Sequence, residues 1–197
     1  MIMFFGGLDL TAGEVKASYL AFLDLELRAR VLKLYTDEEI LNNITRQEVY
    51  AMGIDSPLSF PKQARERGCE RMLRELGIKF FPPVLPAMEK LTKRGMKLAA
   101  TLEKAGIRVL EVYPGGTQDL LCIPRKKASL VGLKEGLERL GIKFVDAKLN
   151  GDALDAVTAA YTVYLYWRGD YLRLKSGDCE LILPVPRCLP RIPSRRY

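Results

Sequence analysis

Acidic residues stand at the positions where a single metal site would need them. Asp9, Asp55 and Glu111 each close a short apolar run that is typical of a buried strand, and Asp155 lies near the start of an apolar helical stretch. The core around a strand disfavours carboxylates, because burying an unpaired charge is very costly. Several acids at strand ends therefore indicate a shared counter-ion. A divalent metal is the candidate.

Each acid also has an ordinary structural explanation. Asp9 could bond backbone amides in the turn at 11–13, and Asp55 could cap the turn that follows it. Asp152 and Asp155 are three residues apart, so they share one face of a helix. Asp152 is a good helix N-cap, and Asp155 would favour the positive end of the helix dipole. We expect Asp155 to be the better metal ligand, with Asp152 as a second.

The composition limits the chemistry. The chain has 197 residues, a net charge of +7 and no histidine. The lack of histidine excludes Ser-His-Asp and Cys-His catalysis, and any zinc site that needs imidazole. Mg²⁺ and Mn²⁺ prefer oxygen ligands, so carboxylates suffice for them. The basic balance favours an anionic partner such as nucleic acid.

Cysteine usage and hydropathy predict an intracellular protein. The four cysteines show no CxxC spacing, so we interpret them as free thiols, with a Cys179–Cys188 bridge as the less favoured alternative. No apolar run approaches the roughly 20 residues that cross a bilayer. The first residues lack the basic leader of a signal peptide. We therefore expect a cytoplasmic protein with no membrane association.

The pattern of elements predicts an α/β fold. Apolar runs and turn residues indicate strands over 1–9, 15–24, 25–35, 49–54 and 107–112, and a hairpin over 171–186. Helices are expected over 36–45, 63–76, 86–105, 127–140 and 152–167, while Pro114-Gly115-Gly116 indicates a turn. Thr36 and Glu39 have the spacing of a capping box. We expect one main domain over 1–170, and a C-terminal hairpin and basic tail over 171–197 that packs on it or extends from it.

The expected topology brings the acids together. Helical crossovers make the first, fourth and fifth strands parallel, with the first strand central and next to the fourth. Ligands of open α/β sheets bind beyond the carboxyl ends of such strands. Asp9, Asp55 and Glu111 all occupy carboxyl ends. For Glu111, a ligand role and an ion pair with a nearby Lys or Arg are about equally expected.

Five motifs, in this order, resemble domain-of-unknown-function family 429, described as predicted nucleases of ribonuclease H-like fold. The motifs are Gly7-Leu8-Asp9-Leu10, Gly53-Ile54-Asp55-Ser56-Pro57-Leu58-Ser59, Arg67-Gly68-Cys69-Glu70-Arg71-Met72-Leu73-Arg74, Glu111-Val112-Tyr113-Pro114 and Asp152-Ala153-Leu154-Asp155-Ala156. The resemblance covers roughly residues 1–167 and implies a central five-stranded mixed sheet flanked by helices. It departs from the family at Ser56, where alanine is more usual, and at Asp55, where resolvases of the superfamily often have Glu.

The resemblance implies phosphodiester hydrolysis by a two-metal mechanism that needs no histidine. Asp9, Asp55, Glu111 and Asp155 are the expected catalytic residues, and Asp9, Asp55, Asp152 and Asp155 the expected ligands of Mg²⁺ or Mn²⁺. Lys62, Arg65 and Arg67 follow Asp55 closely and could contact nucleic acid. Glu70–Arg74 and Arg71–Glu75 spacing favours a solvated, salt-bridged helix face instead.

Two other functions remain open at this point. The first is a non-catalytic nucleic-acid-binding module of the same fold. The second is an ATP-dependent phosphotransferase, because Gly7–Gly13 resembles the first phosphate loop of the actin and sugar-kinase superfamily. Those enzymes place the nucleotide between two such domains, and this chain is too short for two.

Overall fold

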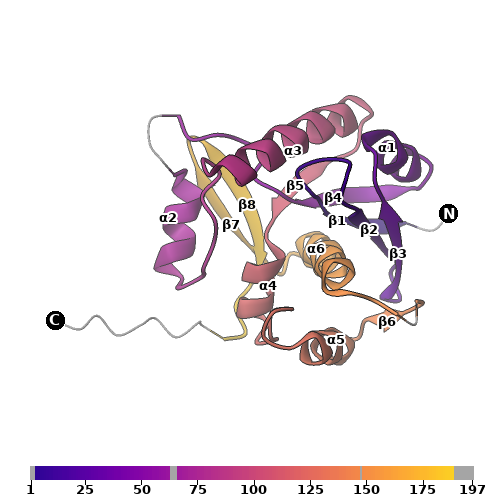
Figure 1. Ribbon diagram of the computed structural model, residues 1–197. Helices are drawn as coiled ribbons and strands as arrows, with labels where there is room; N and C mark the ends of the chain where they lie inside the picture. Colours follow the sequence, from indigo (N-terminus) through magenta and orange to yellow (C-terminus); the bar gives the residue numbers. More distant parts are fainter. Residues whose placement is uncertain (1–2, 63–65, 147, 189–197) are drawn as a thin grey trace.

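The computed structural model describes residues 3–62, 66–146 and 148–188. These residues form a mixed sheet of eight strands in the order β6-β3-β2-β1-β4-β5-β8-β7, flanked by six helices (Figure 1). The strands are β1 (Phe4–Asp9), β2 (Ser18–Leu23), β3 (Arg28–Leu34), β4 (Val49–Asp55), β5 (Val109–Val112), β6 (Lys143–Phe144), β7 (Tyr171–Ser176) and β8 (Cys179–Pro184). The helices are α1 (Asp37–Thr45), α2 (Gly68–Glu75), α3 (Pro86–Lys104), α4 (Pro114–Leu120), α5 (Leu130–Arg139) and α6 (Gly151–Arg168).

The α/β class is as predicted, but the sheet has eight strands where five were expected. The difference arises at both edges, because β6 pairs with β3, and the hairpin of β7 and β8 joins the sheet through β5. The middle of the sheet agrees with the expected topology. β1, β2 and β3 are antiparallel neighbours, and β4 lies parallel between β1 and β5. The carboxyl ends of β1, β4 and β5 therefore lie at one edge.

Strand register determines which acids share a face. Asp9 pairs with Asp55, whereas Glu111 pairs with Ile54. Since paired residues point to the same face and successive residues to opposite faces, Asp9 and Asp55 lie on one face and Glu111 on the other. The first face packs against α6, and the second against α1 and α3 (Figure 1). The side chain of Glu111 thus leaves the sheet on the face opposite to the two aspartates, although all three residues line one cavity at the strand ends.

Helix α6 packs directly on the backbone of β1. A Cβ atom at Gly7 would lie 2.2 Å from both Ala156 O and Ala160 N, so only glycine permits this approach. Gly53 on β4 makes a looser approach to the same helix, where a Cβ atom would lie 2.8 Å from Val163 Cγ2 and 3.1 Å from Ala159 O. The close packing brings the first turns of α6 to the end of β1. The two glycines therefore set the distance between the strand acids and the helix acids.

We expect Gly7→Ala to lower the free energy of unfolding by about 1–3 kcal/mol, because the added methyl group meets backbone atoms that cannot rotate away. Urea denaturation measures this change. Gly13→Ala is the matched control, since a Cβ atom at Gly13 meets nothing within 4 Å. Equal losses in the two variants would contradict the packing argument.

The start of α1 was predicted correctly from its capping residues, whereas the start of α4 was not predicted. Thr36 caps α1 and forms the predicted capping box with Glu39. Residues 114–116, predicted as a turn, instead begin α4, with Pro114 at its first position. Proline is compatible with the first turn of a helix, because the amide it lacks would have no helical partner there. Of the helix expected over 63–76, the structure describes Gly68–Glu75 as α2, and residues 63–65 lie outside the described part.

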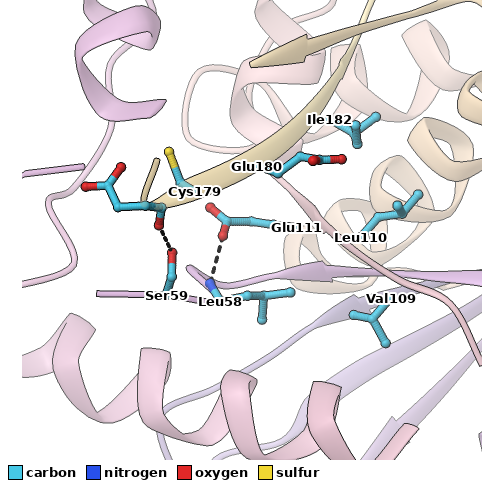
Figure 2. A pocket seen from close by; sticks show the side chains of 9 residues that line it. Leu58, Ser59, Val109, Leu110, Glu111, Cys179, Glu180 and Ile182 are labelled. Atoms are coloured by element: carbon cyan, nitrogen blue, oxygen red, sulfur yellow. Dashed lines mark hydrogen bonds between the residues drawn. The ribbon is translucent and has the colours of Figure 1, made fainter. Parts of the chain in front are cut away.

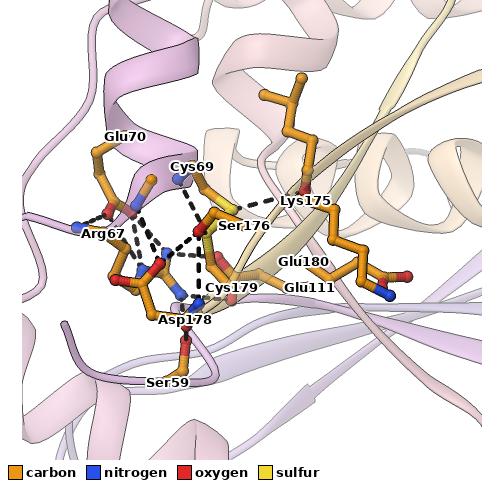
Figure 3. Close-up of a disulfide and its surroundings, with 12 residues drawn as sticks. Ser59, Arg67, Cys69, Glu70, Glu111, Lys175, Ser176, Asp178, Cys179 and Glu180 are labelled. Atoms are coloured by element: carbon orange, nitrogen blue, oxygen red, sulfur yellow. Dashed lines mark hydrogen bonds and ion pairs between the residues drawn. A yellow bond between two sulfur atoms is a disulfide. The ribbon is translucent and has the colours of Figure 1, made fainter. Parts of the chain in front are cut away.

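The prediction of free thiols is wrong. Cys69 is bonded to Cys179, and Cys122 is bonded to Cys188, with Cα atoms 6.0 and 5.9 Å apart. The first bridge joins α2 to the β7–β8 hairpin (Figure 3). Its two cysteines are 110 residues apart, so sequence spacing carried no signal of the pairing. Among the described helices, none has the length and apolar character needed to cross a bilayer.

Candidate metal centre

The candidate centre lies beyond the carboxyl ends of β1 and β4, on the face covered by α6. Asp9 and Asp55 arrive there as register partners at the ends of the two parallel strands. Asn150 caps α6 by accepting a hydrogen bond from the Ala153 amide, so Asp152 and Asp155 lie in the first turns of that helix. Asn150 is therefore the N-cap, and the alternative that Asp152 caps the helix is wrong.

Three of the four predicted ligands come together in a group of metal-binding size. One carboxylate oxygen from each of Asp9, Asp152 and Asp155 lies within 4.8 Å of the others. Asp55 is outside this group but lines the same pocket as Asp9. Asp155 also accepts a hydrogen bond of 2.7 Å from Gln118 Nε2 of α4, which orients its carboxylate. The site therefore combines acids from two strands and a helix with an orienting amide.

A lysine missed in the sequence analysis supplies a cation to these acids. Lys126 Nζ lies 2.5 Å from Asp152 Oδ1 and 2.7 Å from Asp155 Oδ2. Its only sequence signal was the basic run Arg125-Lys126-Lys127, and nothing in that run pointed to α6. Burial lowers the pKa of Lys126, but its hydrogen bonds to Asp152 and Asp155 outweigh this effect and raise it overall. The ammonium group is therefore charged and stands where a counter-ion is needed.

The strand acids are electrostatically unfavourable as carboxylates without a counter-ion. Burial raises the pKa of Asp9 to about 7, the charge of Lys126 opposes the rise, and the charges of Asp155 and Asp152 add to it. Burial also raises the pKa of Asp55 well above its usual value, and the charges of Asp9 and Asp155 raise it further. A divalent cation bound between these groups would reverse this tendency, because it favours their charged forms.

The ordinary structural explanations for the strand acids do not describe this structure. In the turn after β1, the Thr11 amide donates to Ser18 Oγ and the Thr11 hydroxyl donates to Gly13 O. After β4, the Leu58 amide donates to Glu111 Oε2. Within the described residues, neither turn has a backbone amide that donates a hydrogen bond to its preceding aspartate. Asp9 and Asp55 are thus available to a ligand.

Glu111 is held in an ion pair, and the catalytic role expected for it stays a prediction. It accepts from the Leu58 amide at 2.7 Å (Figure 2) and from Arg67 Nη1 and Nη2 at 2.8 and 2.6 Å. Burial raises its pKa, and the hydrogen bonds from Arg67 oppose this rise. Strand register places Glu111 on the sheet face opposite to Asp9 and Asp55, although it lines the same cavity as they do. Of the two alternatives given for Glu111, the ion pair is the one observed.

Arg67 is buried, which contradicts its predicted contact with nucleic acid. Its guanidinium pairs with Glu70 and Glu111 (Figure 3), each at 2.6 Å, and its side chain is 2% exposed. The expected Glu70–Arg74 pair is accordingly absent from α2, since Glu70 bonds Arg67 and Arg74 bonds Glu66. Lys62 is exposed, and its contact with nucleic acid stays a prediction; Arg65 lies outside the described residues.

Two cavities adjoin this region. One, of about 310 Å³, opens where β5 and β8 diverge, and is lined by Glu111, Ser59 and Glu180 among others (Figure 2). The other, of about 210 Å³, has Asp9 and Asp55 in its wall. The second cavity adjoins the candidate centre through these two aspartates.

Comparison with known proteins gives two similar solved structures. The first is described as T. thermophilus RuvC in complex with Holliday junction substrate; identity is 16%, the TM-score is 0.48, and the match covers 86% of this chain and 96% of that one. The second, described as Thermus thermophilus RuvC structure, has 14% identity and a TM-score of 0.48, covering 86% of this chain and 97% of that one. No family model and no curated protein matches the chain.

Proposed function

We propose that this protein is a metal-dependent nuclease of ribonuclease H-like fold. The observation that carries the proposal is the grouping of carboxylates from β1 and α6 at the carboxyl edge of the parallel strands, with Asp55 of β4 next to Asp9. The strand order β3-β2-β1-β4-β5, with the acids on the first strand, the fourth strand and a late helix, supports the fold assignment. The basic character of the whole chain suits a polyanionic substrate.

The donor set fits a hard divalent cation. Carboxylate oxygens are the ligands that Mg²⁺ and Mn²⁺ prefer, and the ammonium of Lys126 already stands among them as a cation. Asp9, Asp55, Asp152 and Asp155 would hold the metal. When bound, a pair of such ions activates a water and stabilises the leaving oxygen of a phosphodiester.

The chain's own residues prepare this site. Gln118 holds the Asp155 carboxylate through Nε2 and also donates to Thr158 Oγ1 at 3.2 Å, which fixes the amide. Lys126 neutralises the helix acids and is partly exposed, so it can move toward solvent or toward a phosphate oxygen. Gly7 and Gly53 hold the helix against the strands. Removing a residue that orients a metal ligand typically lowers metal affinity or activity by about 10–100-fold.

A substrate panel tests the proposal. Purified protein is incubated with single-stranded, duplex, hybrid and branched nucleic acids in Mg²⁺ or Mn²⁺, with EDTA as the control. We expect cleavage of at least one substrate that stops in EDTA. Binding without cleavage of any substrate would favour the non-catalytic module instead. Micromolar ATP affinity in calorimetry would favour the phosphotransferase.

Lys126→Met should raise the affinity for Mn²⁺ by about tenfold, because the variant removes a positive charge that competes for the same carboxylates. The metal-free protein should also unfold at a lower temperature, since Asp152 and Asp155 lose their cation. Calorimetric titration with Mn²⁺ and thermal unfolding in EDTA measure the two effects. Lys127→Met, one residue along and exposed, is the control. Weaker Mn²⁺ binding in Lys126→Met would contradict the assigned role.

A further inference from the structure

The cavity of about 210 Å³ beside the metal centre has two chemically different sides. Asp9 and Asp55 form part of its wall. Much of the remaining wall is apolar or aromatic, contributed by Leu73, Phe80, Phe81, Met88, Leu91 and Tyr113. A ligand that fills the cavity therefore needs an apolar part, and next to it a group that can bind a metal ion held by the carboxylates.

The charged residues of the cavity wall do not need a charged ligand as a partner. Arg67, Glu70 and Glu111 also line it, but they pair with one another. Their hydrogen-bonding groups are used inside the protein, and within the described residues no buried side-chain nitrogen or oxygen lacks a partner. The cavity consequently offers apolar contact on this side rather than charge recognition.

Arginines lie against the aromatic rings of the wall. The Arg74 guanidinium is 5.5 Å from the centre of the Phe80 ring, and that of Arg125 is 5.4 Å from the centre of the Tyr113 ring. Arg125 also donates to the Tyr113 hydroxyl at 3.0 Å. Both arginines have a carboxylate partner, Glu66 and Asp119, so they orient the rings without a large net charge. Aromatic rings interleaved with arginine are the usual platform for single-stranded nucleic acid.

Phe81 is an apolar residue of the cavity wall that is largely exposed to solvent. Its side chain is 67% exposed, although it belongs to the most hydrophobic class of residue. It follows Phe80 and precedes Pro82-Pro83, and proline restricts both its own φ and the residue before it. The ring is thus displayed on a stiff segment at the cavity. Because Phe81 shares the cavity wall with Phe80 and Tyr113, its exposed ring belongs to a group of aromatic rings rather than standing alone.

We propose that this cavity receives an unstacked nucleobase adjoining the scissile phosphodiester, so that the substrate is single-stranded or branched rather than continuous duplex. The inference rests on the proposed nuclease function. A nucleotide has the required two-part chemistry, with a flat apolar face joined to an anionic phosphate. A base inside a continuous duplex is stacked on both faces, whereas single strands, ends and junctions leave bases free to enter a pocket.

The test follows a fluorescent base rather than cleavage. The probe is an oligonucleotide with one 2-aminopurine, whose emission falls when the base stacks on an aromatic ring, presented as a single strand, in a branched junction and in a continuous duplex. Fluorescence is read by stopped flow in Mg²⁺, before cleavage accumulates. Wild type is compared with Phe81→Ala, Phe81→Leu and Phe81→Tyr. Val131→Ala is the matched control, since Val131 is 68% exposed on α5 and outside the cavity.

Phe81→Ala should bind the single-stranded and branched probes about tenfold more weakly and lose the fluorescence change, because each base–aromatic stack contributes of that order. Phe81→Tyr should behave as wild type, Phe81→Leu should lose the fluorescence change, and duplex affinity should stay constant in all variants. Unchanged binding of the unpaired probes by Phe81→Ala overturns the inference. An equal loss of affinity for the duplex probe in Phe81→Ala also overturns it. The same holds if Phe81→Ala keeps its affinity for the probes and light scattering shows that only the self-association of the protein has changed.

The two proposals fail separately in this design. If wild type cleaves but Phe81→Ala binds and cleaves normally, the nuclease function stands and the base pocket is wrong. If wild type cleaves nothing yet shows base binding that depends on Phe81, the base pocket stands and the nuclease function is wrong.

Discussion

Asp9→Asn is expected to lower metal-dependent cleavage by at least about 100-fold while leaving the fold intact. The variant removes one carboxylate from the group of Asp9, Asp152 and Asp155 and adds no bulk. Even residues that only support metal ligands change activity by about 10–100-fold, so the loss of a ligand should exceed that range. Initial cleavage rates at saturating Mn²⁺ measure the effect.

The same variant should stabilise the metal-free protein above neutral pH. Burial raises the folded-state pKa of Asp9 to about 7, while its unfolded value is near 3.8. Between these values the folded state binds more protons than the unfolded state, so stability falls as pH rises from about 4 to about 7. Each unit of pKa displacement corresponds to about 1.4 kcal/mol. The asparagine side chain in the variant cannot ionise, so this loss of stability disappears.

Adding Mn²⁺ should make wild type more stable than Asp9→Asn, which is the reverse of the order expected without metal. At pH 8, wild type should gain thermal stability on metal addition and Asp9→Asn should gain little, because ligand binding to the folded state alone is stabilising. Asp170→Asn is the control, since Asp170 is half-exposed and pairs with Arg168 away from the centre. Cleavage that survives in Asp9→Asn, or equal metal stabilisation of both proteins, would show that the metal binds elsewhere.

Arg67→Met should lower the free energy of unfolding by about 3–5 kcal/mol, the range found when one partner of a buried ion pair is removed. The variant leaves Glu70 and Glu111 buried without their cation, and it frees the Leu58 segment that Glu111 holds. Urea denaturation at pH 7 measures the loss. The loss should shrink at lower pH, because burial raises the pKa of Glu111 and this carboxylate becomes neutral there.

Arg67→Lys separates the effect of charge from that of hydrogen-bond geometry, and a variant of Arg71 is the control. Arg67→Lys keeps the charge but cannot bond both glutamates in the forked manner of a guanidinium, so an intermediate loss is expected. Arg71→Met changes an exposed arginine in the same helix and should cost less than about 0.5 kcal/mol. A loss in Arg67→Met no larger than in Arg71→Met would show that the buried network contributes little.

The elements near the site were largely predictable, because their signals are local. Thr36 and Glu39 marked the start of α1, and the acids that close apolar runs marked the ends of β1 and β4. The parallel arrangement followed from helical crossovers between strands. Local pattern and connection rules were sufficient for these features.

Side-chain partners across the fold were not predictable in the same way. Glu111 ends a strand just as Asp55 does, yet one step in register places it on the other face of the sheet. The pairing of Lys126 with α6 and of Cys69 with Cys179 joins segments 26 and 110 residues apart in sequence. Such contacts depend on how elements pack, and hydrophobic periodicity does not specify the partner of an individual charged or sulfur-bearing side chain.

The glycine contact between β1 and α6 has a consequence for how the centre can change. Main-chain atoms of β1 and α6 meet directly at Gly7, so no rotamer change in that layer can alter the spacing of the two backbones. Substitutions can delete a ligand or lengthen one, as glutamate for aspartate would. The main-chain spacing of β1 and α6 is therefore fixed by the backbone contact at Gly7, and only the acidic side chains themselves can adjust the distances between their oxygens.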